Sequence, residues 1–323
     1  MFEFIPYSES ILKKNEWDNF VDGSDNGTIF HKRKFLSYHP ESRFKDHSLV
    51  VKKNEKLFSV FPAVELNREG KKTISSHGGA SYGGFVYNID LNLKDAFDLV
   101  EGLVKNAKKN NFDRIQITLP PIIYETKYSN YIDFALVKNG FQYLKREISS
   151  VVQLDIDPGQ LLYTYRAEAR TAVNKSVKKG VVIKECDNYE EYYEILKKNL
   201  KLRHNVTPTH TVEELKKIKN LFPEEVRLWG AFLGEKLIAG VCNFSANPKV
   251  VLAFYISHDE DYQEYRAVNQ LFYEIMKKYQ EEKFRFLDFG IFTVNMNPNW
   301  GLARFKENFG ARGIFRDTLY LEL

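Results

Sequence analysis

SLVVKKNEKLFSVFPAVEL (residues 48–66) and RLWGAFLGEKLIAGVCNFS (residues 227–245) share one pattern. Each stretch alternates apolar and polar residues on both sides of a short turn, at 54–57 in the first and 234–237 in the second. The turns begin with Asn54 and Gly234, and Asn and Gly are the residues that most readily adopt the positive φ of a tight hairpin turn. Both stretches therefore predict a β-hairpin.

The segments that follow the two hairpins also match in order. Each hairpin is followed by a strand (83–87; 250–257), a helix with apolar residues at helical spacing (96–107; 268–276) and a short strand (from 112; from 284). Each half then closes with a helix that ends at a glycine, Gly140 or Gly310, and with a final long strand. Agreement over five elements predicts an internal duplication.

The predicted fold class is therefore α/β (α+β), with two tandem domains that each carry a mixed central sheet flanked by helices. The turn signal Asp157-Pro158-Gly159 places the boundary between them, which gives domains 1–157 and 158–323. Thr211, followed three residues later by Glu214, predicts the start of a further helix in the second domain.

Composition excludes several classes of protein. The chain has 323 residues and a net charge of +4, far less positive than that of a dedicated DNA-binding protein. No stretch approaches the roughly 18 consecutive apolar residues of a transmembrane helix, and the N-terminus lacks the features of a signal peptide, so we expect a cytoplasmic protein. The two cysteines, Cys186 and Cys242, have no metal-site spacing, and no HExxH or GxSxG motif is present. We expect no metal and no serine or thiol hydrolase chemistry.

Four segments resemble the GNAT acyltransferase superfamily, and in particular the tandem-GNAT proteins of the FemABX and FemAB-like (BioF2-like) group. They are RTAVNKSVKKGVVI (170–183), GEKLIAGVCNFS (234–245), LDFGI (287–291) and NWGLARFKENFGARGIFRDTLYLEL (299–323). The resemblance implies N-acyl transfer to an amine of a sugar, a nucleotide-sugar or a peptide precursor of the bacterial cell envelope. It also implies a donor that is either acyl-CoA, such as acetyl-CoA, or aminoacyl-tRNA.

The sequence leaves the donor open. GNAT proteins that bind CoA carry a glycine-rich basic loop for its pyrophosphate, whereas the corresponding segments here, 258–270 and 88–97, contain no glycine and are rich in acidic residues. The basic coiled-coil arm of some tRNA-dependent relatives is absent as well. A third hypothesis is a noncatalytic scaffold that binds a glycan or a protein. The sequence predicts no oligomeric state.

The resemblance places Phe305 and Lys306 at the active site, where a fixed cation would stabilise the negative charge of the tetrahedral intermediate or of a donor phosphate. The alternative for Lys306 is a solvated residue on an amphipathic helix. Asp288 is a candidate general base and Tyr255 a candidate acid or orienting hydroxyl, although a water chain could remove the proton instead.

The candidate substrate-binding residues come from three segments. The glycine-rich stretch HGGASYGG (77–84) predicts either a backbone-lined substrate contact or a sharp turn between strands. The basic stretch 31–34 and the helix that contains Arg170 are each either contacts for an acceptor phosphate or solvated surface. The candidates are Lys32, Lys34, Tyr82, Gly83, Arg170 and Asn174.

Overall fold

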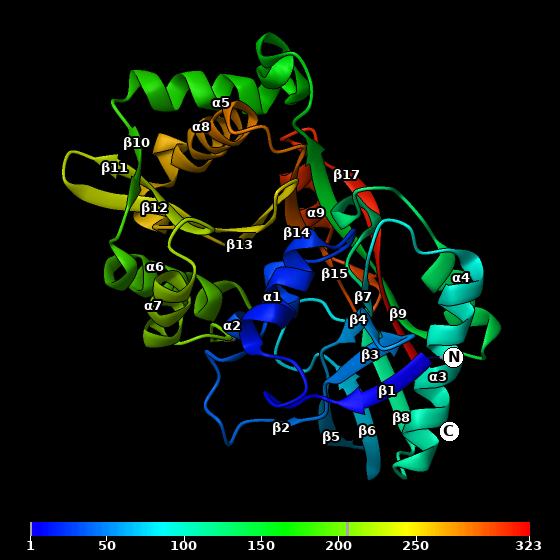
Figure 1. The fold of residues 1–323 in the computed structure, drawn as a ribbon. Helices are drawn as coiled ribbons and strands as arrows, with labels where there is room; N and C mark the ends of the chain where they lie inside the picture. The colour runs from blue at the N-terminus through cyan, green and yellow to red at the C-terminus, as the bar shows by residue number, and fades with distance from the viewer. Residues whose placement is uncertain (1, 205–206) are drawn as a thin grey trace. The chain divides into compact units, whose positions relative to one another are not determined.

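The computed structural model describes residues 2–204 and 207–323, which form two compact units (Figure 1). The first unit comprises residues 1–147 and 315–323, and the second comprises residues 148–314. Both are α/β units with mixed sheets, so the predicted fold class is confirmed. No helix of the described residues has the length and apolar character needed to cross a bilayer.

The first unit contains two sheets. In chain order its elements are β1 (Phe2–Pro6), α1 (Lys14–Gly23), η1 (Ile29–His31), α2 (Arg33–Leu36), β2 (Lys45–Asp46), β3 (Leu49–Lys53), β4 (Lys56–Phe61), β5 (Val64–Arg68), β6 (Lys71–Ser76), β7 (Val86–Tyr87), α3 (Leu93–Lys109), β8 (Arg114–Thr118), η2 (Ile122–Tyr124), α4 (Tyr131–Lys138) and the first part of β9 (Gln142–Gln153). One sheet has the order β1-β3-β4-β7, and β8, β6, β5 and β2 are neighbours in the other.

The second unit has helices on both faces of its sheet. Its elements are η3 (Pro158–Thr164), α5 (Ala167–Lys178), β10 (Val182–Cys186), α6 (Tyr189–His204), α7 (Val212–Leu221), β11 (Val226–Leu233), β12 (Lys236–Asn247), β13 (Val250–His258), η4 (Glu260–Tyr265), α8 (Ala267–Glu281), β14 (Phe286–Ile291), β15 (Thr293–Val294), β16 (Asn297–Pro298), α9 (Trp300–Glu307) and the start of β17 (Arg312–Glu322). Strands β10 to β14 are neighbours in that order, with α5 beside α8 in Figure 1.

The two predicted hairpins are confirmed. β3 pairs antiparallel with β4, and β11 pairs antiparallel with β12. The turn residues Asn54 and Gly234 have φ values of 50° and 60°, as the turn chemistry requires. Because β8 and β14 each follow the long helix of their repeat, the order of elements in the two halves agrees with the predicted duplication.

The compact units do not follow the predicted boundary at 157. Strand β9 begins in the first unit, and its residues Val151–Gln153 pair with β14. Strand β17 begins in the second unit, and its residues Thr318–Glu322 pair with β8. The last strand of each sequence repeat therefore ends in the sheet of the other unit. As a result, the first unit ends at residue 147 instead of 157, and residues 315–323 belong to it as well. Strand pairing over this distance leaves no local sequence signal.

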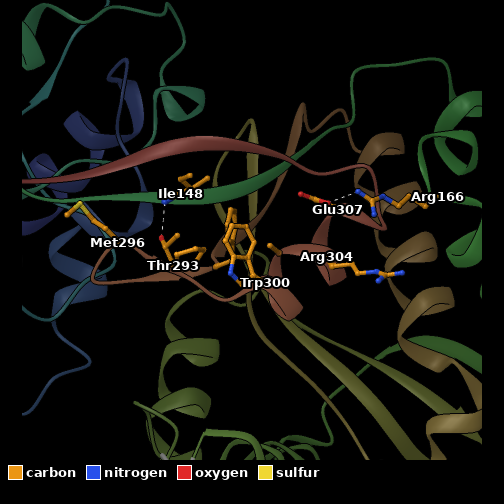
Figure 2. Close-up of a pocket in the computed structure, with 10 residues that line it drawn as sticks. Ile148, Arg166, Thr293, Met296, Trp300, Arg304 and Glu307 are labelled. Carbon is orange, nitrogen blue, oxygen red and sulfur yellow. Dashed lines mark hydrogen bonds and ion pairs between the residues drawn. The ribbon is translucent and has the colours of Figure 1, made fainter.

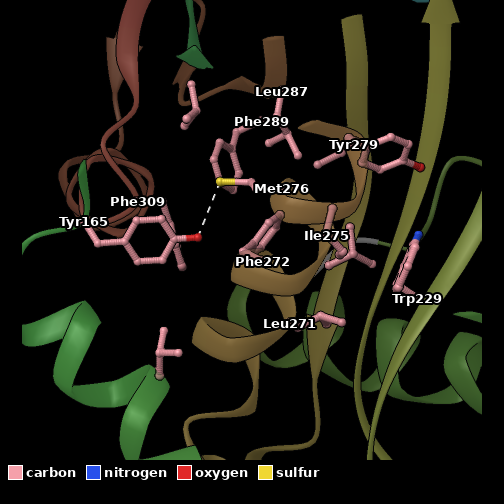
Figure 3. Packing of buried hydrophobic residues seen from close by; sticks show 14 of the residues in the cluster. Tyr165, Trp229, Leu271, Phe272, Ile275, Met276, Tyr279, Leu287, Phe289 and Phe309 are labelled. Atoms are coloured by element: carbon pink, nitrogen blue, oxygen red, sulfur yellow. Dashed lines mark hydrogen bonds between the residues drawn. The ribbon is translucent and has the colours of Figure 1, made fainter. Parts of the chain in front are cut away.

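An aromatic cluster joins the sheet of the second unit to its helices (Figure 3). Phe309, which is fully buried, lies edge-on to Tyr165 with 5.2 Å between ring centroids and also contacts Phe272 and Phe289. The Tyr165 hydroxyl donates to the Met276 sulfur at 3.4 Å. These contacts hold the end of α9 against the core and so position the candidate site.

Candidate functional site

Helix α9 presents a lysine to the interior of the second unit. The helix begins at Asn299, whose side chain accepts a hydrogen bond from the Leu302 amide at 3.0 Å, and it is followed by Gly310 with a φ of 83°. Its inward face carries Ala303 and Lys306, and Lys306 is only 2% exposed. Lys306 is therefore not the solvated lysine of an amphipathic helix.

The Lys306 ammonium contacts the end of strand β14. Its Nζ donates to the carbonyl oxygens of Gly290 and Ile291, both at 2.7 Å. Gly290 has a φ of 71°, and the pairing of β14 with β9 shifts register between Asp288 and Ile291, which marks a bulge at this point. Burial lowers the pKa of Lys306 to about 7, and the nearby Asp288 carboxylate partly opposes this shift. The side chain can therefore change charge near neutral pH.

Asp288 lies inside the sheet with no exposed surface. One of its carboxylate oxygens accepts hydrogen bonds from the Ser149 hydroxyl and from the Gly290 amide, the latter at 2.7 Å. These contacts brace the bulge whose carbonyls hold Lys306. These contacts favour a positioning and electrostatic role for Asp288. They give less support to the role of general base that the sequence suggested, because the carboxylate does not line the pocket of the second unit.

A pocket of about 500 Å³ lies over α9 and the segment that follows β14 (Figure 2). Its walls are mostly apolar, and its polar rim carries the ion pair of Arg166 with Glu307, whose charged atoms are 2.6 Å apart. The Trp300 side chain is 77% exposed. The lining residues are Ile148, Arg166, Phe292, Thr293, Met296, Pro298, Trp300, Ala303, Arg304 and Glu307.

Lys306 and the pocket share their supporting elements. Ala303 and Glu307 of α9 line the pocket. Phe292 also lines it, and this residue directly follows Ile291, whose carbonyl accepts a hydrogen bond from Lys306. Phe305 is partly buried and packs against the core of the unit, with 5.1 Å between its ring centroid and that of Phe309. The predicted pair Phe305-Lys306 thus combines an anchor with a buried cation.

The pairing of strands β13 and β14 ends near this site. Residues Val250–Leu252 of β13 pair in parallel with residues Phe286–Asp288 of β14. The pairing ends there, although β13 continues to His258. Tyr255 lies on this continuing part of β13, where its hydroxyl is 3.0 Å from Nδ1 of His210 and burial raises its pKa. Tyr255 does not line the pocket, so a role as acid stays a prediction.

An acidic turn precedes helix α8. Asp259 caps this turn by accepting from the Asp261 amide, and Glu260 and Glu264 follow within η4. Lys198 and Lys236 each approach Asp259 at 3.6 Å. The turn is held by these ion pairs and contains no glycine, unlike a loop that wraps a pyrophosphate.

The other predicted substrate-binding residues are dispersed. Nη1 of Arg170 donates to the Tyr165 carbonyl at 2.7 Å, and Asn174 is exposed on α5. Lys32 forms an ion pair with Asp22 at 2.6 Å, and Lys34 is exposed in the first unit. Their contacts to a substrate stay predictions.

Gly83 and Tyr82 are packed inside the first unit. Tyr82 is almost completely buried, and its hydroxyl is 3.3 Å from that of Tyr124. The Gly83 amide donates to the Thr118 carbonyl at 2.8 Å, and its carbonyl contacts Nε2 of His31 at 3.2 Å. Burial lowers the pKa of His31 to about 4, so this histidine is neutral at physiological pH. The close packing matches the alternative in which the glycine-rich stretch is structural.

Sequence reasoning missed Arg166, Trp300 and Arg304. The only local signal was the tryptophan directly after the Asn297-Pro298-Asn299 turn, because a large aromatic residue at the exposed start of a helix has no packing role there. The two arginines carry no motif.

Comparison with known proteins defines the class first. Residues 163–307 match the family model described as an acetyltransferase (GNAT) domain. The chain thus contains a GNAT domain, which confirms the predicted class of enzyme, a GNAT N-acyltransferase. No curated protein sequence matches significantly.

Solved structures extend the likeness to the whole chain. FemX is 14% identical over 99% of this chain and 97% of its own, with a TM-score of 0.75. A tandem GNAT protein from the clavulanic acid biosynthesis pathway is 11% identical over 100% and 98%, with a TM-score of 0.57. L-PGS from Bacillus licheniformis is 9% identical over 97% and 91%, with a TM-score of 0.59. The expected resemblance to the tandem-GNAT proteins of the FemABX group is confirmed at the level of the fold.

We predict that Gly83→Ala destabilises the protein by about 2–4 kcal/mol, measured by chemical denaturation. A Cβ at this position would lie 2.2 Å from the Ser76 carbonyl, whereas a Cβ at the exposed Gly23 would meet nothing within 4 Å. The control Gly23→Ala, at the end of α1, should not destabilise the protein and should stabilise it by up to about 1 kcal/mol. Unchanged stability with lost activity in Gly83→Ala would instead support the substrate contact.

Proposed function

We propose that the second unit transfers an acyl group from a CoA thioester to an amine of a sugar, a nucleotide-sugar or a cell-wall peptide precursor. The observation that carries this proposal is the buried Lys306 ammonium at the bulged end of β14, on the helix whose Ala303 and Glu307 line an open pocket. A buried cation is costly unless its surroundings hold it, and here two carbonyls and a nearby carboxylate do so. Such a group supports chemistry in which negative charge develops.

The reaction requires little else from the protein. The amine nitrogen attacks the carbonyl carbon, the carbonyl oxygen becomes an oxyanion, and the C–S bond then breaks to release the thiol while the amine loses a proton. An ammonium group has three N–H donors, and the two carbonyls of β14 engage two of them. We assign the third to the oxyanion. Because Asp288 Oδ1 already accepts hydrogen bonds from Ser149 and Gly290, we assign removal of the proton to water.

The end of the pairing between β13 and β14 favours a thioester donor. Among the residues that the structure describes, the two strands pair with each other only as far as Leu252 and Asp288. The part of β13 beyond Leu252 has no partner in β14, and a strand edge can bond an extended ligand such as the pantetheine arm of CoA, which carries two amides. The thioester would thereby approach the end of β14, where Lys306 lies.

Aminoacyl-tRNA is the second candidate donor, and the acidic turn before α8 favours it. Asp259, Glu260 and Glu264 would repel a pyrophosphate at the place where CoA is usually held. An aminoacyl ester needs no such loop. In addition, α5 carries exposed Lys175 and Lys178, which could contact a nucleic-acid backbone.

We expect Lys306→Met to lower kcat at least about 100-fold, because the variant cannot stabilise the oxyanion. The measurement is thiol release from acetyl-CoA with a UDP-linked amino sugar as acceptor. Lys277→Met, on the surface of α8, is the matched control and should retain full activity. Equal activity of the two variants would remove Lys306 from the mechanism.

The pH dependence tests the charge of Lys306. Its pKa is lowered to about 7, and the proposal requires the protonated form. With an arylamine acceptor that stays uncharged, kcat/KM should be constant below about pH 7 and fall about tenfold for each further pH unit. A rate that rises through pH 7 would mean that neutral Lys306 acts as a base, contrary to the proposal.

The donor is identified by ligand-induced stabilisation of the whole chain. A donor at about 100 times its Kd should raise the free energy of unfolding by about 2.7 kcal/mol. Stabilisation by acetyl-CoA or a longer acyl-CoA supports the thioester. Stabilisation only by charged tRNA, weakening steeply with salt, would replace it with the aminoacyl ester.

A further inference from the structure

The pocket of the second unit has apolar walls that are open to solvent (Figure 2). Its volume of about 500 Å³ lies within the range of small-molecule sites. Trp300 and Met296 are 77% and 57% exposed, so much of their apolar surface contacts water in the free protein. A ligand that covers this surface gains hydrophobic free energy. The apolar lining residues are Ile148, Phe292, Met296, Pro298, Trp300 and Ala303.

Met296 lies in a turn that suits a different residue. Val294 of β15 pairs with Asn297 of β16, which leaves Asn295 and Met296 as the two loop residues, with φ values of 51° and 62°. Asn and Gly adopt this conformation readily, whereas Met adopts it at a cost in stability. The turn alone therefore favours Gly at position 296. The Met296 side chain lines the pocket, and methionine is flexible enough to fit apolar ligands of varied shape.

The charged side chains at the pocket are paired. Arg166 pairs with Glu307 at 2.6 Å and Arg304 approaches Glu168 at 3.8 Å, so the net charge of these two pairs is zero. Thr293 carries the one side-chain hydroxyl or amide among the described lining residues, and its Oγ1 accepts from a backbone amide at 3.1 Å. A sugar needs several oriented hydrogen-bonding groups, and an ionised ligand needs an unpaired charge. The lining therefore fits an uncharged apolar group.

The pocket shares a wall with the segment that holds Lys306. Phe292 lines the pocket and directly follows Ile291, whose carbonyl accepts from the Lys306 ammonium. In the proposed reaction the carbonyl oxygen of the donor lies at this ammonium. The chain attached to the same carbonyl would then extend along the segment that lines the pocket.

We propose that this pocket binds the hydrocarbon chain of the acyl donor, and that the enzyme transfers acyl groups longer than acetyl in preference to acetyl. The inference rests on the proposed function, because it assigns a place to one part of the same donor. Met296 and Trp300 are then residues that determine the specificity for the acyl group. Each CH₂ group that they cover strengthens binding.

Trp300 allows binding in the pocket to be observed directly. Of the three tryptophans of the chain, Trp17 and Trp229 are buried and Trp300 is exposed. The probes are N-acetylcysteamine thioesters of acetyl, hexanoyl and decanoyl groups, which lack the nucleotide of CoA and need no pyrophosphate site. We expect the decanoyl thioester, and not the acetyl thioester, to shift the emission of Trp300 to shorter wavelength. Each added CH₂ group should strengthen binding about two- to fourfold.

The variant Met296→Gly separates ligand binding from folding. Because Gly suits the positive φ at this position, the variant should be at least as stable as the parent protein in chemical denaturation. It should nevertheless lower the ratio of kcat/KM for decanoyl-CoA to that for acetyl-CoA at least about fivefold, because the apolar contact is lost. The matched control is Asn295→Gly, which changes the same turn at a residue that does not line the pocket, and it should keep the ratio of the parent protein.

Three outcomes would overturn the inference. They are equal binding of the acetyl and decanoyl thioesters, equal ratios for Met296→Gly and Asn295→Gly, and an emission of Trp300 that shifts with protein concentration in the absence of ligand. The last result would assign the exposed surface to a second copy of the chain.

The same measurements separate this inference from the proposed function. Turnover of acetyl-CoA without preference for a longer chain would overturn the inference and leave the proposed acyl transfer in place. Tight binding of the decanoyl thioester without turnover of any thioester would overturn the proposed reaction, although the pocket would still bind the chain.

Discussion

The hydrogen bonds from the Lys306 ammonium to the carbonyls of Gly290 and Ile291 are the constraint on which the candidate site depends. A buried cation needs oxygen partners, and a regular strand would engage these carbonyls in its own ladder. The bulge at Gly290 frees them, and the buried Asp288 holds the bulge by accepting from the Gly290 amide. The pKa of Lys306 is near 7 in the folded state, which is below its value in the unfolded chain. Burial of the protonated lysine therefore lowers the free energy of unfolding at low pH. This destabilisation declines as the pH rises from about 7 toward the pKa of the unfolded chain. A stable fold alone would not select this arrangement.

Much of the fold could be predicted because its signals are local. Asn54 and Gly234 take the positive φ that their hairpins need, and Thr211 with Glu214 forms the predicted capping box of α7. The units, however, depend on where the last strands pair. Nothing near β9 or β17 in the sequence indicates that each completes the sheet of the other unit, because a strand pattern specifies a face and not a partner.

The candidate site was predictable only in part, for a similar reason. The position of Lys306 followed from its motif, but its burial depends on the bulge at Gly290. Arg166 and Trp300 meet at one pocket only because the segment after β14 folds back over α9. Gly83 shows the converse: a glycine that allows close approach has the same sequence signature whether a ligand or the chain's own backbone approaches. Here Thr118 and His31 occupy its polar groups.

The duplication supplies an internal comparison that bears on Lys306. Gly140 and Gly310 end equivalent helices, and the residue four positions earlier is Leu136 in the first unit and Lys306 in the second. Leu136 is fully buried in the core, so the fold itself is satisfied by a leucine at this place. When β8 and β14 are aligned from their first residues, Asp288 corresponds to Gln116 and Gly290 to Thr118. The lysine, the bulge glycine and the carboxylate thus occur together in one unit and are all replaced in the other. These three residues depend on one another physically, and the shared fold does not require them. Their confinement to the second unit supports the proposal that acyl transfer takes place there.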